Sequence, residues 1–181
     1  GEVLEEHPDW RNGRPELTWN CIGVGGASLN PAAAEEKLIF RHVYKLANTH
    51  PDVVFLHIGE NDIVTMDKDD IWRKIVQLVE CISAVAHPKA VVIGQVTSFP
   101  AQGEAGAKSK HINERLKMYC CGERYQSHNG GAYVSIWKHR IGIFGPNRRR
   151  KYARDGVHLN HETMREYAHS VGTAMNQAYN E

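Results

Sequence analysis

The chain has 181 residues, of which 41% are hydrophobic and 24% are charged, and its formal net charge at pH 7 is +1. This length predicts one domain whose core needs no disulfide or metal, and the balanced charge excludes a global field favouring nucleic acid or acidic substrates. No apolar run approaches the roughly 20 residues of a membrane span, and no hydrophobic leader follows Gly1, although processing before Gly1 would remove one.

The first part of the chain predicts a helix remnant, a short strand and a second helix. Residues 2–6 are typical of the tail of a helix, because a proline soon follows them. Residues 17–24 predict a short strand that leads into a glycine turn at residues 23–26. Asn30 is a suitable N-cap, and the proline after it suits a first helical turn, so we expect a helix over residues 31–49.

The next stretch, residues 53–62, predicts a buried strand that ends in a polar turn. Its first half is apolar and rich in β-branched residues, as in a strand buried on both faces of a parallel sheet. The strand delivers Asn61 and Asp62 to the carboxyl edge of the sheet, where ligands bind in open α/β folds. The Asn61 amide could donate to a developing oxyanion there, although an ordinary Asn-Asp turn also fits.

Strands and helices continue to alternate along the rest of the chain. This alternation predicts an α/β fold, in which a parallel sheet carries helices on both faces with right-handed crossovers. The expected elements are a helix over residues 67–86, a strand over 89–96, a loop over 97–108, a helix over 109–125, a strand over 132–136 and a last helix over 161–179 capped by Asn160.

A long stretch without periodicity, residues 137–157, precedes the last helix. Loops of about twenty residues are uncommon in compact domains, so this stretch is a candidate binding or lid segment. It carries a run of cations, although a solvated basic loop also fits because aromatic stacking partners are missing. The cations are Arg148, Arg149, Arg150, Lys151 and Arg154.

The sequence Asp155-Gly156-Val157-His158 lies at the end of this loop, just before the last helix. A spacing of three lets the Asp155 carboxylate reach one ring nitrogen of His158 and fix its tautomer, which leaves the other nitrogen free to act as a base. A structural Asp and His at a loop-helix junction fit the same pattern. The glycine turn at residues 23–26 is similarly open to two interpretations, a tight turn or an exposed backbone N–H.

The histidines and cysteines predict no metal or cofactor. The 11 histidines are scattered and form no cluster with ligand spacing. The four cysteines include an adjacent pair and no C-x-x-C motif, which argues against a disulfide framework and favours a reducing, cytoplasmic environment.

Three motifs occur in a fixed order: Gly-Gly after the first predicted strand, G-x-N-D after the next strand, and D-x-x-H before the last helix. Together they resemble the second, third and fifth sequence blocks of the SGNH (GDSL-like) hydrolase family over residues 17–178. The chain is also similar to the esterase-like domains of some animal retrotransposon-encoded proteins, in which G-x-N-D and D-G-V-H-L recur. The resemblance implies a flavodoxin-like, three-layer α/β/α fold and ester hydrolysis without a metal.

The resemblance also implies a role for each matching residue. Gly26 would offer its backbone N–H and Asn61 its side-chain amide to the oxyanion. His158 would be the general base, and Asp155 would orient it. The implied substrate is a small ester or acetyl group.

The match breaks at the nucleophile, because the family's Gly-Asp-Ser block does not occur in this sequence. Ser28 follows the glycine turn rather than a strand, and no motif of the family that the chain resembles places a nucleophile there. We therefore expect residues 1–181 to form a single domain that is incomplete at its N-terminus, with the serine-bearing first strand lying before Gly1. The rival hypothesis is a pseudoenzyme that fills this gap in another way.

Two functions from different classes follow. The first is a serine esterase of SGNH type that works through an acyl-enzyme. The alternative is a catalytically inactive module that binds nucleic acid or anionic lipid through Arg148, Arg149, Arg150 and Lys151. Salt separates them, because binding through those cations weakens steeply with ionic strength and cleavage of a neutral ester does not.

Overall fold

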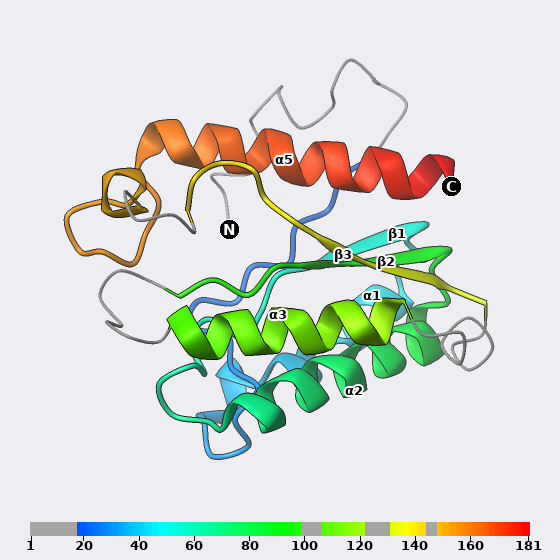
Figure 1. Ribbon diagram of the computed structural model, residues 1–181. Coiled ribbons are helices and arrows are strands. Elements are labelled where there is room, and N and C mark those ends of the chain that lie inside the picture. Colours follow the sequence, from blue (N-terminus) through cyan, green and yellow to red (C-terminus); the bar gives the residue numbers. More distant parts are fainter. Residues whose placement is uncertain (1–17, 99–105, 122–130, 144–147) are drawn as a thin grey trace.

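The computed structural model describes residues 18–98, 106–121, 131–143 and 148–181. Three parallel strands form one sheet in the order β1-β2-β3, with α1, α2 and α3 on one face and α5 on the other (Figure 1). The described elements are η2 (Glu35–Lys37), η3 (Ile39–His42), α1 (Tyr44–Ala47), β1 (Val53–Leu56), α2 (Lys68–Ala86), β2 (Ala90–Gly94), α3 (Gly106–Cys120), β3 (Tyr133–Trp137), η5 (Arg148–Lys151) and α5 (His161–Asn180). The predicted α/β, three-layer architecture is confirmed.

The sheet places all three carboxyl ends at one edge. Val53 of β1 pairs with Ala90 of β2, and Ala90 pairs in turn with Tyr133 of β3. The central strand β2 is buried along its whole length, which explains its unbroken apolar sequence. The long helices α2, α3 and α5 all begin on the side where the strands end (Figure 1), so the loops at this edge can share a site.

Helix α2 supplies much of the core beneath the sheet. The Asp67 side chain caps its first turn by accepting the backbone N–H of Asp69, and His87 ends it in a left-handed conformation with φ of 49°. The buried residues recur at helical spacing, as predicted, and contact the sheet and α3. They include Ile71, Ile75, Leu78, Val79 and Ile82.

Helix α5 covers the opposite face, and its predicted start is confirmed. The Asn160 side chain accepts the backbone N–H of Thr163 at 2.8 Å, as an N-cap does. Small side chains such as Ala174 and Ala178 pack against Ala90 and Val92 of β2, so the helix lies close to the sheet. Neither α5 nor any other helix in the described part of the chain has the length and apolar character needed to cross a bilayer.

Two predictions near the start of the described chain are wrong. Residues 18–27 form no strand, and the helix predicted over residues 31–49 is replaced by three short helical pieces, η2, η3 and α1. The cause is a parallel bridge between Ser28 and Leu38, in which the Ser28 N–H donates to Lys37 O at 2.8 Å. Leu38 is held in an extended conformation (φ −68°, ψ 108°), which interrupts any helix through it.

Other boundaries shift by a few residues. Helix α3 begins at Gly106 rather than near residue 109, and residues 122–125, at the end of the predicted helix, lie outside the described residues. Strand β3 spans Tyr133–Trp137, one residue later than predicted. The helix remnant predicted at residues 2–6 also lies outside the described residues.

Candidate functional site

The turn after β1 brings Asn61 against the glycine turn. Gly59 adopts a φ of +110°, which favours glycine, and its carbonyl accepts the Asp62 N–H at 3.2 Å. Asn61 is exposed, and its Nδ2 donates to the carbonyl of Ala27 at 2.9 Å. Gly26, with φ of +68°, directly precedes Ala27 and is also exposed. The second amide hydrogen of Asn61 has no partner among the described residues, so it can serve a ligand.

Buried Asp62 fastens the same two turns together. Its side chain is 1% exposed and accepts the Ser28 hydroxyl and, at 3.0 Å, the Leu29 N–H. The two predicted blocks that carry Gly26 and Asn61 are therefore one hydrogen-bonded unit. The Ser28 hydroxyl is buried and engaged by this carboxylate, which argues against Ser28 as a nucleophile.

Asp155 and His158 form the hydrogen-bonded pair that their spacing predicts. His158 Nδ1 lies 2.7 Å from Asp155 Oδ2. The backbone N–H groups of Val157 and His158 donate to Asp155 Oδ1 at 2.9 and 3.0 Å. The hydrogen bond from His158, followed by these backbone bonds, lowers the pKa of Asp155 to about 2. Nδ1 therefore carries the proton towards an ionised carboxylate, and Nε2 is left as the basic nitrogen on a side chain that is 79% exposed.

A short hairpin holds this pair. The Ala153 N–H donates to the His158 carbonyl at 2.7 Å, and Tyr152 and Leu159 form an antiparallel bridge. Arg149 also stabilises this hairpin, because its guanidinium donates to the carbonyls of Arg154 at 2.6 Å and Ala153 at 3.4 Å. These contacts fix the backbone immediately before Asp155.

The rest of the predicted basic segment, η5, is partly engaged within the protein. Arg148 Nη1 donates to Ser98 Oγ at 3.2 Å, and Lys151 Nζ forms an ion pair with Glu166 at 2.8 Å. The Arg150 side chain is exposed and makes no hydrogen bond or ion pair with a described residue. Three of the four predicted binding cations thus make contacts within the protein, and one of them, Arg149, contacts the backbone just before Asp155.

The two halves of the candidate site lie at the same end of the sheet. The loop that carries Asp155 and His158 leads into α5, and the Asn61 turn follows β1 (Figure 1), both on the side where the strands end. No hydrogen bond joins His158 to Asn61 or Gly26 within the described ranges. The structure therefore forms each predicted pair and places both at one edge.

A buried polar cluster beside Asn61 was missed by the sequence reasoning. His57 Nε2 lies 2.6 Å from Glu60 Oε1, which also accepts the Thr97 N–H at 3.1 Å, and His57 Nδ1 hydrogen-bonds the Tyr167 hydroxyl. Burial lowers the pKa of His57, but the charge and hydrogen bond of Glu60 outweigh burial and raise it overall. Burial likewise raises the pKa of Glu60, and the His57 charge overcomes this and lowers it. A spacing of three between His57 and Glu60 was the available signal.

A second histidine, His139, packs against this cluster. It is 1% exposed, and its ring centroid lies 4.8 Å from that of Tyr167 and 6.0 Å from that of His57. Its Nδ1 hydrogen-bonds Ser170 Oγ at 2.9 Å. Burial, and then the His57 charge, lower the pKa of His139 to about 4, so this ring is neutral at pH 7.

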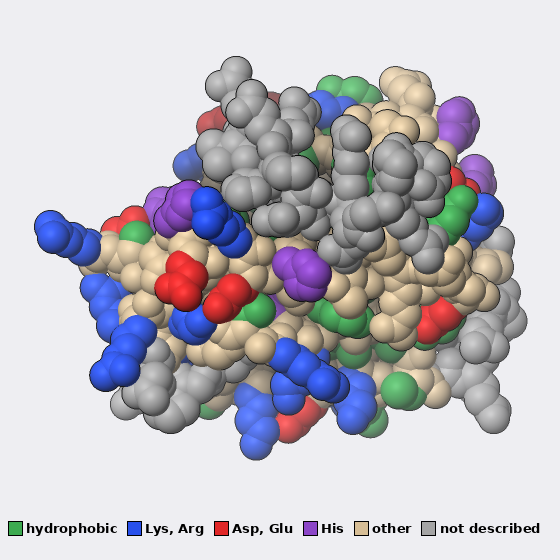
Figure 2. Space-filling view, turned by 90° about the horizontal axis from the view of Figure 1, so that it is seen from above, with side chains coloured by type: hydrophobic (Ala, Val, Ile, Leu, Met, Phe, Trp, Pro, Cys, Tyr) green, Lys and Arg blue, Asp and Glu red, His purple; other side chains and the backbone are tan. Residues whose placement is uncertain are grey.

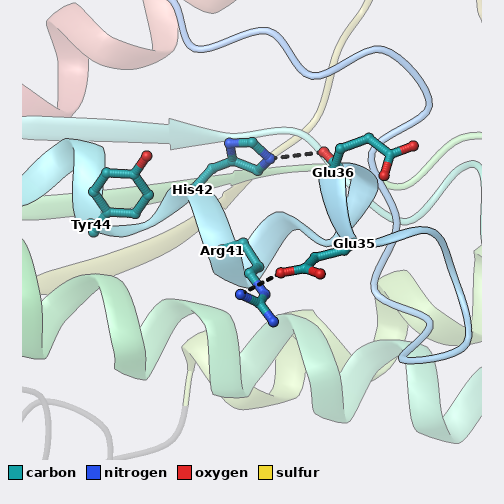
Figure 3. A pocket seen from close by; sticks show the side chains of 5 residues that line it. All are labelled: Glu35, Glu36, Arg41, His42 and Tyr44. Atoms are coloured by element: carbon teal, nitrogen blue, oxygen red, sulfur yellow. Dashed lines mark hydrogen bonds and ion pairs between the residues drawn. The ribbon is translucent and has the colours of Figure 1, made fainter.

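A shallow hollow of about 470 Å³ lies elsewhere, over η2, η3 and α1 (Figure 3). Its polar contacts are an exposed ion pair of 2.6 Å between Arg41 and Glu35 and a hydrogen bond from His42 to the Glu36 carbonyl. None of the predicted site residues lines it. Among the described residues, no group of three or more His, Cys, Asp or Glu side chains is placed to hold a metal ion.

Comparison with known proteins gives one match. A family model described as the GDSL-like lipase/acylhydrolase family matches residues 4–166, a range that includes the glycine turn, the G-x-N-D turn and the D-x-x-H loop. No curated protein and no solved structure matches the chain.

Proposed function

Because the chain belongs to the GDSL-like lipase/acylhydrolase family, we propose that it is a serine esterase that cleaves a small ester or acetyl group through an acyl-enzyme. The observation that carries this proposal is the Asp155-His158 pair, in which an ionised carboxylate holds Nδ1 and leaves Nε2 as a base. The hydrogen-bonded unit of Asn61 and the glycine turn supports it on the oxyanion side.

In the proposed reaction, His158 Nε2 takes the proton of a serine hydroxyl as its oxygen attacks the ester carbonyl. Asp155 stabilises the imidazolium that forms. The Asn61 amide and the Gly26 backbone N–H donate to the oxyanion of the tetrahedral intermediate. Collapse of the intermediate expels the alcohol, which receives the proton from His158. Water then attacks the acyl-enzyme by the same steps and releases the carboxylic acid and the serine.

The proposal assigns the nucleophile to none of the described residues. The Ser28 hydroxyl donates a hydrogen bond to the Asp62 carboxylate, and no Gly-Asp-Ser block occurs in the sequence. Labelling the natural polypeptide with a fluorophosphonate, followed by peptide mapping, identifies the serine that carries the adduct.

The direct test is hydrolysis of a short-chain chromogenic acetyl ester. It is measured with this chain and, where the natural polypeptide extends before Gly1, with that polypeptide as well. Exposed imidazoles cleave activated esters slowly, so His158→Ala is compared with His161→Ala, which removes another exposed histidine nearby. We expect His158→Ala to lower kcat by on the order of 10³-fold or more and His161→Ala to leave it unchanged. Equal, small losses in both variants would refute the proposal.

The exposed cations favour one alternative function, a binding module without catalysis. Arg150 and Arg154 are exposed beside the His158 loop. Figure 2, viewed from the α5 side, shows Lys and Arg side chains gathered at the end of the molecule where this loop lies. If this module is the function, Arg150→Gln weakens the binding of single-stranded nucleic acid or anionic vesicles, and that binding falls steeply as salt rises.

A further inference from the structure

An ion pair between His57 and Glu60 lies directly beside Asn61 and is largely withdrawn from water. The Glu60 side chain is 9% exposed and that of His57 is 26% exposed, and their closest atoms are 2.6 Å apart. Removing two charges from water is unfavourable, and apolar side chains of similar size often stabilise a protein as well or better. Stability alone therefore gives no reason for this pair at the end of β1.

Glu60 joins the turn that carries Asn61 to the neighbouring strand. Its Oε1 accepts both the His57 ring N–H and the backbone N–H of Thr97, which follows β2, at 3.1 Å. The Thr97 side chain in turn hydrogen-bonds Tyr152, which lies in the hairpin of His158. One carboxylate thus connects the Asn61 turn with the segment that holds the candidate base.

His57 makes a second connection to the same segment. Its Nδ1 hydrogen-bonds the hydroxyl of Tyr167, which lies on α5, the helix that begins just after His158. Because both ring nitrogens of His57 are engaged, the ring bridges β1 and α5. Glu60, the neutral His139 ring and the Tyr167 hydroxyl face this bridge. Tyr152 interacts electrostatically with Glu60, and Cys21 interacts electrostatically with Tyr167.

The backbone of residues 59–62 decides where the Asn61 amide points. One amide hydrogen is used on Ala27 O, and the direction of the other depends on how the turn is held. Glu60 is the residue next to Asn61, so its two hydrogen bonds restrain this turn directly. We propose that Glu60 and His57 are positioning residues that orient the Asn61 amide relative to the His158 loop. This inference rests on the proposed function.

The first test is a double-mutant cycle on ester hydrolysis. Glu60→Gln keeps the shape of the side chain and removes its charge, and Glu80→Gln on the exposed side of α2 is the matched control. We expect Glu60→Gln to lower kcat by about 10- to 100-fold with little change in KM. In an Asn61→Ala background, which itself lowers kcat by on the order of 10²–10³-fold, Glu60→Gln should add no further loss. Losses that multiply would overturn the proposal.

The second test needs no catalysis, so it separates failure of this inference from failure of the proposed function. The side-chain amide of Asn61 is followed by ¹H–¹⁵N NMR in the unsubstituted protein from pH 5 to 9. We expect its signals to shift with a midpoint above 6.5, as His57 loses its proton and leaves the Glu60 carboxylate without a cationic partner. They should also move in Glu60→Gln and in His57→Gln but stay in place in Glu80→Gln. If they ignore pH and both substitutions, the positioning role is excluded whether or not the protein hydrolyses esters.

Discussion

Arg149 shows at the scale of one residue how a basic run serves structure. Its guanidinium donates to two successive carbonyls just before Asp155, at 3.4 and 2.6 Å. A planar fork with several donors can satisfy both carbonyls at once. The cationic sequence of residues 148–151 predicts a binding surface equally well, because the sequence does not reveal which donors face inward.

Removing these two hydrogen bonds should make the loop that carries the candidate base less well ordered. We expect Arg149→Gln to lower kcat for a neutral acetyl ester by about 10-fold, since small displacements of catalytic groups have large effects on rate. Arg140→Gln, a charge-matched change at an exposed arginine in the preceding loop, should have no effect. Steady-state kinetics at two salt concentrations checks this. A similar loss in Arg140→Gln that shrinks at high salt would instead indicate a general effect of removing surface charge.

The contacts of the candidate site differ in whether the sequence alone predicts them. The contact between Asp155 and His158 follows from their spacing of three residues and is found at 2.7 Å. The link between His57 and Tyr167 joins residues 110 positions apart. A local motif contains no information about such a partner, because only the packing of α5 on the sheet brings the two together.

At the scale of elements, the buried strands and amphipathic helices were predictable and the region around η2, η3 and α1 was not. The unbroken apolar run of β2 and the apolar stripe of α2 are local patterns that indicate burial without knowledge of distant contacts. The predicted helix over residues 31–49 had good start signals, but the bridge between Ser28 and Leu38 overrides them. This bridge is a tertiary contact, which helix propensity does not include.

Helix α2 offers a matched test of the core. Ile75 is fully buried, and we expect Ile75→Ala to lower the free energy of unfolding by about 2–5 kcal/mol through the cavity it leaves. Val85 on the same helix is 39% exposed, so Val85→Ala should change the free energy of unfolding by less than about 1 kcal/mol. Urea denaturation followed by circular dichroism measures both. Similar losses in the two variants would show that α2 does not hold the core as described.

At the scale of the whole molecule, the family and the three-layer architecture could be predicted from the order of three short motifs along the chain. Each motif is ambiguous alone, and their common placement after strands or before a helix makes the combination specific. The likeness to retrotransposon-encoded esterase domains stays a prediction, as does the catalytic role of each site residue.

The buried histidines make the stability of the whole molecule depend on pH. The pKa of His139 is lowered to about 4, so below pH 6.5 the unfolded chain binds a proton that the folded protein does not. Stability should therefore fall as pH drops from 6.5, by up to roughly 3 kcal/mol from this residue. The pKa of His57 is raised, so its contribution is complete below pH 6.5 and is lost only as pH rises. That of Glu60 is lowered, so its contribution is lost only in stronger acid.

Chemical denaturation at several pH values between 7 and 4.5 checks this dependence. Between pH 6.5 and 4.5, we expect the free energy of unfolding to fall less steeply in His139→Gln than in the unsubstituted protein. This holds even if the variant is less stable at every pH. The exposed His169→Gln on α5 should keep the slope of the unsubstituted protein. An unchanged slope in His139→Gln would mean that His139 binds its proton in the folded state as readily as in the unfolded one.

The hairpin around Asp155 and His158 also bears on the order in which the protein acquires its chemistry during folding. Loops of this size close within about 10–100 ns, because little chain entropy is lost. The bond between Asn61 and Ala27 spans 34 positions and needs the sheet edge to be in place. A partly folded chain would therefore hold an oriented imidazole before it holds the amide donor, and esterase activity would report completion of the global fold rather than formation of the hairpin.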